Sequence, residues 1–209
     1  MTTQACRVCS QVMEHGVCPN PLCADPSRQI TRIRAIAYYS GDLATTIKRY
    51  KYQGKVGWSL LFGRLLVAWL VENGRANRPD LIVANPTFHD AGSPSSGHTE
   101  RVLEAAARED LLDEWPFDAA VPRAVVKTHA TPTSAGKSAT EKREAAAQLR
   151  RALRVPERAR TQGRHVLVYD DICTTGHQLD AVADVLMSEG DAADVEAVVL
   201  ARAPWRLSA

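Results

Sequence analysis

Two adjacent carboxylates follow one of the most apolar runs of the chain and precede a short polar turn. The run covers residues 166–169, and Asp170 and Asp171 come directly after it. Such a run predicts a buried strand, so both carboxylates are expected at its carboxyl end, beside the next helix. Carboxylate oxygens in that position can accept hydrogen bonds from sugar hydroxyls or face a metal-bound sugar.

The turn after the carboxylates has the composition of an anion-binding loop. It consists of Ile172, Cys173, Thr174, Thr175 and Gly176. Backbone N–H groups in a turn that opens a helix attract an anion, and threonine hydroxyls add donors. Gly176 allows close backbone approach because it has no Cβ atom. A phosphate site next to sugar-binding carboxylates predicts a ribose 5-phosphate ligand. The alternative is a pair of solvated turn carboxylates that cap the next helix.

A second constellation lies near the start of the chain. Four of the five cysteines have the spacing C-x2-C-x8-C-x4-C: Cys6, Cys9, Cys18 and Cys23. In a reducing cytoplasm, clustered thiols indicate a metal before disulfides, and four thiolates complete a closed tetrahedral Zn²⁺ site. A ribbon of ~25 residues cannot bury a core of its own, so the metal would supply its folding energy. Two alternatives stay open: His15 replaces one thiolate, or the metal is absent.

The segment 170–176 resembles the signature by which type I phosphoribosyltransferases bind 5-phosphoribosyl 1-diphosphate. The resemblance is to the ComF-like branch, also called the ComF or GntX type, and extends over nearly the whole chain. This branch joins an N-terminal four-cysteine zinc module to a phosphoribosyltransferase fold. The resemblance implies that Asp170 and Asp171 contact the ribose 2- and 3-hydroxyls, with Mg²⁺ attached to the sugar diphosphate. Residues 172–176 would bind the 5-phosphate.

Other segments are similar to the same family more loosely. Residues 51–54 match a lysine-tyrosine-glycine element, which implies a diphosphate contact for Lys51. Residues 128–139 would form a mobile hood, in which Lys137 brings positive charge to the diphosphate, and an arginine-bearing helix follows at 141–143. The pyrophosphate loop would contain Asn85, Pro86 and Thr87.

Two positions depart from the family pattern. Residues 95–101 stand where an Arg-Gly-Phe-Asn-Gln-like element is usual, and only Gly97 and Arg101 correspond to parts of it. Gln178 stands where serine or threonine commonly adds a phosphate hydroxyl. An amide can also donate to phosphate.

Apolar periodicity and turn residues predict alternating strands and helices. We expect strands at 33–39, 81–84, 124–127, 165–169 and 195–200. We expect helices at 43–51, 56–72, 99–112 and 179–188, and one that follows a capping box at 138–141. This order predicts an α/β fold with a mostly parallel sheet and helices on both faces. With the resemblance, the expected organisation is a zinc ribbon at 1–30 and a type I phosphoribosyltransferase-like domain at 31–209.

The composition is that of an ordinary globular protein. The 209 residues are 45% hydrophobic and 24% charged, with a net charge of +2, which excludes a fibrous or disordered chain and gives no strong case for nucleic acid. The apolar run 59–71 is interrupted by Gly63 and Arg64 and is too short to span a bilayer. The first residues lack the apolar segment of a signal peptide, so we expect a cytoplasmic protein.

The function that the resemblance implies is a Mg²⁺-dependent phosphoribosyltransferase with 5-phosphoribosyl 1-diphosphate and an unidentified nitrogenous acceptor as substrates. One alternative is a catalytically silent, competence-type protein that binds a phosphoribosyl ligand or nucleic acid, the latter through arginines such as Arg150 and Arg151. A P-loop nucleotidase at 135–138 is disfavoured, because Thr131 stands where that loop needs glycine. Homo-oligomer formation is left open, and no membrane partner is expected.

Overall fold

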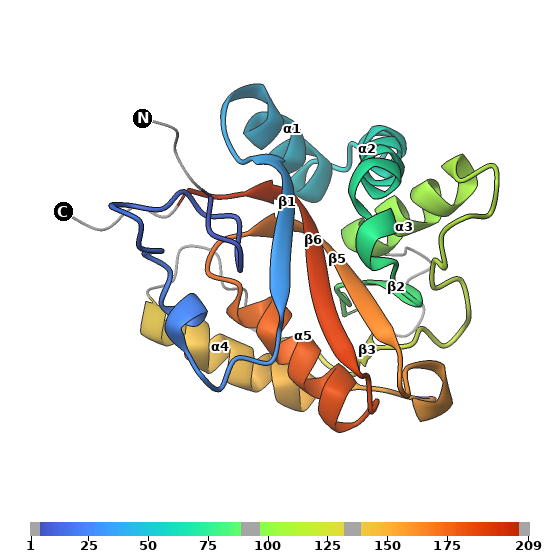
Figure 1. Ribbon diagram of the computed structural model, residues 1–209. Helices are drawn as coiled ribbons and strands as arrows, with labels where there is room; N and C mark the ends of the chain where they lie inside the picture. The colour runs from blue at the N-terminus through green and yellow to red at the C-terminus, as the bar shows by residue number, and fades with distance from the viewer. Residues whose placement is uncertain (1–4, 89–96, 132–138, 205–209) are drawn as a thin grey trace.

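The computed structural model describes residues 5–88, 97–131 and 139–204. Its main sheet has four parallel strands in the order β1-β6-β5-β2 (Figure 1). The bounds are Arg32–Tyr38 for β1, Leu81–Ala84 for β2, His165–Cys173 for β5 and Asp194–Arg202 for β6. The two central strands are buried along nearly their whole length, which explains their continuous apolar sequence.

Helices cover both faces of this sheet (Figure 1). One face carries α1 (Gly41–Tyr52), α2 (Trp58–Asn73) and α3 (His98–Glu109), whose buried side chains include Phe62, Leu66 and Val102. The other face carries α4 (Ala139–Ala152) and α5 (His177–Ser188), with Leu149 and Val182 in the core. The prediction of an α/β fold with a mostly parallel sheet is confirmed.

The predicted strand at 124–127 does not join the main sheet. Only Val126–Lys127 (β3) is extended, and it pairs antiparallel with Leu153–Arg154 (β4) in a separate two-stranded sheet. The edge of β2 that is not paired with β5 is occupied instead by residues 116–118. Ile82 N–H donates to the Pro116 carbonyl, and Asp118 N–H donates to the Ile82 carbonyl. Residues 124–127 therefore cannot reach the edge of β2.

The segment 5–31 has little regular structure. It contains two isolated bridges, Ala5 with Val12 and Glu14 with Val17, and a 3-10 turn at Pro21–Ala24. Two further 3-10 turns lie at Arg75–Asn77 and Arg158–Arg160. Leu22 and Ile30 belong to the same core as α4 and α5. Across the described ranges, none of the helices has both the length and the apolar character needed to cross a bilayer.

Candidate functional site

A cavity of about 740 Å³ opens at the carboxyl ends of the sheet strands. Ligands of open parallel sheets bind at this edge, and the volume lies within the usual range for small-molecule sites. The structure brings Lys51 together with residues 85–87 and residues 170–176 in the cavity wall. Lys137 and most of the predicted hood lie outside the described residues, as does the P-loop-like segment 135–138.

The two aspartates lie at the floor of this cavity. Asp170 is 7% exposed and Asp171 is 2% exposed, because β5 runs between β2 and β6. Lys51 Nζ of α1 lies 2.9 Å from Asp171 Oδ1, and His98 Nε2 of α3 lies 3.2 Å from Asp171 Oδ2. Two helices on one face thus hold this carboxylate between two basic side chains.

Charge and burial change the pKa values of Asp170 and Lys51. Burial, and after it the nearby Asp171 carboxylate, raise the pKa of Asp170 to about 7, although Lys51 opposes both effects. Burial disfavours the charge on Lys51, but Asp171 and Asp170 outweigh it, so the pKa of Lys51 is raised. Lys51 therefore stays protonated at neutral pH, while Asp170 is close to its titration midpoint.

Part of the predicted phosphate loop, residues 172–173, belongs to β5. β5 continues through Ile172 and Cys173, because Cys173 pairs in register with Arg202 of β6. The strand therefore ends later than the predicted 169, and only residues 174–176 form the connection to α5. No side chain caps the start of α5 within the described chain. Cys173 is buried, which raises the pKa of its thiol to about 12, so it acts as a packing residue.

Gly176 is required for two reasons. Its φ of 88° lies in the left-handed region, which favours glycine. A Cβ atom at this position would also lie 2.7 Å from Ile33 Cδ1 and 2.8 Å from Leu22 Cδ2. The backbone of this turn is thus packed directly against β1 and the N-terminal segment.

The loop after β2 is held by the first turn of α3. Glu100 Oε1 accepts hydrogen bonds from Thr87 N–H at 2.8 Å and from Thr87 Oγ1 at 2.9 Å. Thr99 Oγ1 donates to the Asn85 carbonyl at 2.7 Å. Gly97 allows this approach, because a Cβ there would overlap Thr87 Oγ1. Residues 97–100 therefore hold in place the loop 85–87, for which the sequence analysis predicted pyrophosphate binding.

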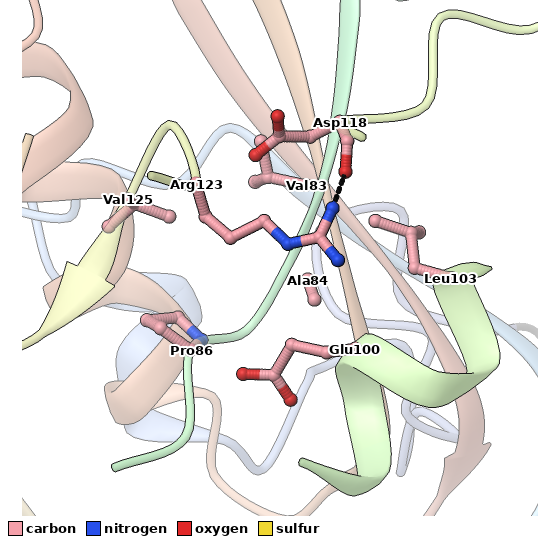
Figure 2. Close-up of a pocket in the computed structure, with 8 residues that line it drawn as sticks. All are labelled: Val83, Ala84, Pro86, Glu100, Leu103, Asp118, Arg123 and Val125. Carbon is pink, nitrogen blue, oxygen red and sulfur yellow. Dashed lines mark hydrogen bonds between the residues drawn. The ribbon is translucent and has the colours of Figure 1, made fainter. Parts of the chain in front are cut away.

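Figure 2 shows a much smaller cavity behind this loop. Its volume is about 10 Å³, roughly what one water molecule needs. The Arg123 guanidinium lies between Asp118, whose carbonyl accepts its hydrogen bond, and Glu100. Pro86 lines this cavity, which is too small for a sugar phosphate.

The four N-terminal cysteines converge on one point. Their Sγ atoms lie within 4.8 Å of one another, with Cys6 and Cys23 3.8 Å apart and Cys9 and Cys18 3.7 Å apart. A tetrahedral zinc site with 2.3 Å bonds requires sulfur separations of about 3.8 Å. His15 is exposed and is not part of the cluster. The arrangement is compatible with a zinc ribbon.

The thiols of Cys9, Cys18 and Cys23 have pKa values that are shifted in different directions. A hydrogen bond from Cys23 lowers the pKa of Cys9 to about 4. Burial raises the pKa of Cys18 to about 11, and the hydrogen bond with Cys9, together with burial, raises the pKa of Cys23 far above its usual range. A divalent cation would stabilise all four thiolates at once.

Several residues of the cavity were not predicted from the sequence. His98 and Lys142 line it, and so does Lys48 of α1. Of these residues, His98 could best have been predicted, because it follows Gly97 at the start of a predicted helix. Its distance from Asp171 depends on the packing of α3 against the sheet, which no local pattern reveals.

Several arginines at the end of α4 and after it form ion pairs. Arg150 pairs with Asp184 of α5, and Arg158 Nη2 lies 2.7 Å from Asp191 Oδ2. Arg160 pairs with the buried Asp118. These contacts give Arg150, Arg158 and Arg160 carboxylate partners within the chain, whereas the exposed Arg151 is in none of these three pairs.

Comparison with known proteins gives distant relatives. The chain is 25% identical to the DNA utilization protein YhgH of Escherichia coli K12 over 191 residues, which cover 90% of this chain and 80% of the relative. It is 25% identical to the protein of the same name from Shigella flexneri over 200 residues, which cover 94% of this chain and 83% of the relative. No protein-family model matches the chain. The similarity suggests a relationship along most of the length.

Proposed function

We propose that the protein is a Mg²⁺-dependent phosphoribosyltransferase that uses 5-phosphoribosyl 1-diphosphate and a nitrogenous acceptor. The observation that carries the proposal is the position of Asp170 and Asp171 near the carboxyl end of β5, two residues before the turn 174–176 that leads into α5, in a cavity of about 740 Å³. The proposal includes the type I phosphoribosyltransferase fold and the division into a zinc module at 1–30 and a transferase domain at 31–209.

The residues of the cavity fit the parts of this substrate. The Asp170 and Asp171 carboxylates would accept hydrogen bonds from the ribose hydroxyls, and the N–H groups of residues 174–176 would bind the 5-phosphate. Lys51, now 2.9 Å from Asp171, would exchange this carboxylate for a diphosphate oxygen. Mg²⁺, which prefers carboxylate and phosphate oxygens, would stabilise the negative charge of the leaving diphosphate.

The reaction breaks the bond between ribose C1 and the diphosphate oxygen and forms a bond from C1 to the acceptor nitrogen. The electron pair of the broken bond leaves with the diphosphate, and the acceptor loses a proton. C1 passes through an oxocarbenium-like state, so positioning and charge stabilisation are the main contributions of the protein.

Calorimetric titration with the diphosphate sugar and Mg²⁺ tests the proposal. Wild type should bind, and Asp170→Asn/Asp171→Asn should lose binding, whereas Asp191→Asn on the surface should bind as wild type does. Absence of binding to wild type, or equal binding by the double variant, would contradict the assignment. Release of diphosphate on addition of candidate nitrogen nucleophiles then tests turnover.

Nucleic-acid binding is the second candidate, and the name of the relatives, which refers to DNA utilization, favours it. Under this alternative, affinity for DNA should fall steeply as salt rises and should be lost in Arg150→Ala/Arg151→Ala. The diphosphate sugar would not compete. Salt-sensitive DNA binding without sugar binding would move the assignment to this class.

A further inference from the structure

The guanidinium of Arg202 lies between the phosphate turn and the cysteine cluster. Arg202 ends β6 and is completely buried. Its Nη1 donates to the Cys173 carbonyl at 2.9 Å and to the Thr174 carbonyl, while Nη2 lies 3.6 Å from Cys9 Sγ. One side chain thus contacts both the turn and a thiol of the cluster.

Asn20 makes the next contact along the same turn. It lies in the sequence between Cys18 and Cys23 and is 1% exposed. Its Nδ2 donates to the Thr175 carbonyl at 2.9 Å, and its Oδ1 accepts from Leu22 N–H at 3.2 Å. Three consecutive carbonyls, those of residues 173–175, are therefore held by Arg202 and Asn20.

The geometry of the peptide bond links these contacts to anion binding. In a planar trans peptide, the C=O of one residue and the N–H of the next point in opposite directions. The peptides of this turn are trans, since the cis bond of the described chain is Val121–Pro122. Carbonyls held toward the cysteine cluster therefore direct the N–H groups of residues 174–176 away from it. Within the described ranges, these N–H groups donate to no other residue.

The charge of Arg202 also links the phosphate turn to the cysteine cluster. A buried guanidinium is costly unless an opposite charge compensates it. No carboxylate of the described residues forms an ion pair with Arg202, whereas the sulfurs of Cys9 and Cys173 lie at 3.6 Å and 3.2 Å. A zinc ion with four thiolates carries a net charge of about −2. The loaded cluster would therefore supply the missing counter-charge.

We propose that Arg202 is a positioning residue through which the metal-loaded cysteine cluster orders the phosphate turn. Zinc fixes the thiolates, the thiolates hold the guanidinium, and the guanidinium and Asn20 hold the carbonyls of residues 173–175 so that the following N–H groups face the cavity. Loss of the metal loosens the turn and weakens binding of a sugar 5-phosphate. The part of this inference that concerns the sugar rests on the proposed function.

Hydrogen exchange at residues 172–176, measured without sugar, tests the coupling. Arg202→Lys keeps the charge but cannot reach the turn and Cys9 together, so exchange should rise about tenfold with zinc still bound. Removal of zinc from wild type by a chelator should raise exchange at the same residues by a similar factor. Removal of zinc from Arg202→Lys should then raise exchange little further, because the substitution and the chelation break the same series of contacts.

Matched variants separate this coupling from a general loss of stability. Arg34→Lys changes a largely buried arginine of β1, paired with Glu196 at 2.7 Å, and should leave exchange at 172–176 unchanged. Asn20→Ala, which also breaks a turn contact, should raise exchange at Gly176 if Arg202→Lys does not fold. Exchange at residues 165–169 of β5 reports global unfolding. Unchanged exchange at the turn after chelation, or after both turn variants, would overturn the proposal.

Titration with ribose 5-phosphate distinguishes failure of the coupling through Arg202 from failure of the proposed function. Wild type with zinc should bind about tenfold more tightly than Arg202→Lys. If the sugar phosphate fails to bind wild type while chelation still loosens the turn, the proposed function fails and the coupling stands. If wild type binds and the variant or chelated protein binds equally well, the coupling fails and the proposed function stands.

Discussion

Asp170 and Asp171 are neighbours in sequence but lie in different electrostatic surroundings. Asp171 lies between Lys51 and His98, whereas the backbone N–H of Asp171 donates to Asp170 Oδ1 at 2.9 Å. Successive side chains of a strand point to opposite faces, so two neighbouring carboxylates can have different partners. This difference determines how the site should respond to pH.

Asp170→Asn should change the pH dependence of stability. The raised pKa, about 7, means that the folded protein keeps a proton between about pH 4 and pH 7 that the unfolded chain has lost. The free energy of unfolding of wild type therefore has a component that falls as pH rises through this window. The variant lacks this component, so its stability relative to wild type should increase from pH 4 to pH 7 in thermal unfolding.

Asp191→Asn provides the opposite control. Hydrogen bonds from Arg158 and Gln162 lower the pKa of Asp191, so its small contribution to stability is lost as pH falls below the usual aspartate range. If the free energy of unfolding depended on pH in the same way in wild type and Asp170→Asn, the prediction of a raised pKa for Asp170 would be wrong.

Lys51→Met should destabilise the fold as well as the site. The change leaves the buried Asp171 carboxylate without its ammonium partner, and breaking a buried pair costs about 3 kcal/mol. Urea unfolding measures the loss. Lys48→Met, on the same helix but exposed, should have little effect on stability. Equal stability of the two variants would argue that Lys51 does not compensate Asp171.

At the scale of elements, the sequence predicted the helices and most strands because their apolar patterns are strong. The end of β5 was predicted too early, since the polar residues Asp170 and Asp171 break the apolar pattern while pairing with β6 continues to Cys173. The strand at 124–127 was misplaced for another reason. Competition for the edge of β2 is settled by residues 116–118, and local propensity carries no information about that competition.

Gly63→Ala should disrupt the contact between α2 and α3. A Cβ atom at Gly63 would lie 2.7 Å from the backbone nitrogen of Ala106, so the helices would have to separate. Overpacking of this kind costs ~1–3 kcal/mol, measurable by chemical denaturation. Gly57→Ala is the control, because it has open space and an ordinary φ of −58°. A neutral Gly63→Ala would mean that the two helices can move apart freely.

At the scale of the whole molecule, the sequence predicted the cysteine cluster from spacing alone, and the structure brings its sulfurs to zinc-like separations. It could not predict what the cluster touches. Cys9 meets Arg202, and Asn20 meets Thr175, across most of the length of the chain. Contacts of this range follow from the path of β6 through the centre of the sheet.

Metal analysis of the purified protein should give about one zinc per chain. Cys9→Ser should lose the metal, because three thiolates form an incomplete site, whereas Cys173→Ser should retain it. A zinc-free wild type in which residues 5–31 remain protected from exchange would contradict the assignment.

The position of β6 has a consequence for synthesis on the ribosome. β1 has a single neighbour in the main sheet, β6, and Arg32 pairs with Glu196, so β1 must wait for most of the chain to be translated. At ~5–20 residues per second this delay is on the order of ten seconds. All four clustered cysteines emerge long before Arg202. If the cluster binds zinc, a nascent chain can therefore acquire the metal first, and the turn 174–176 would then fold against a centre already assembled.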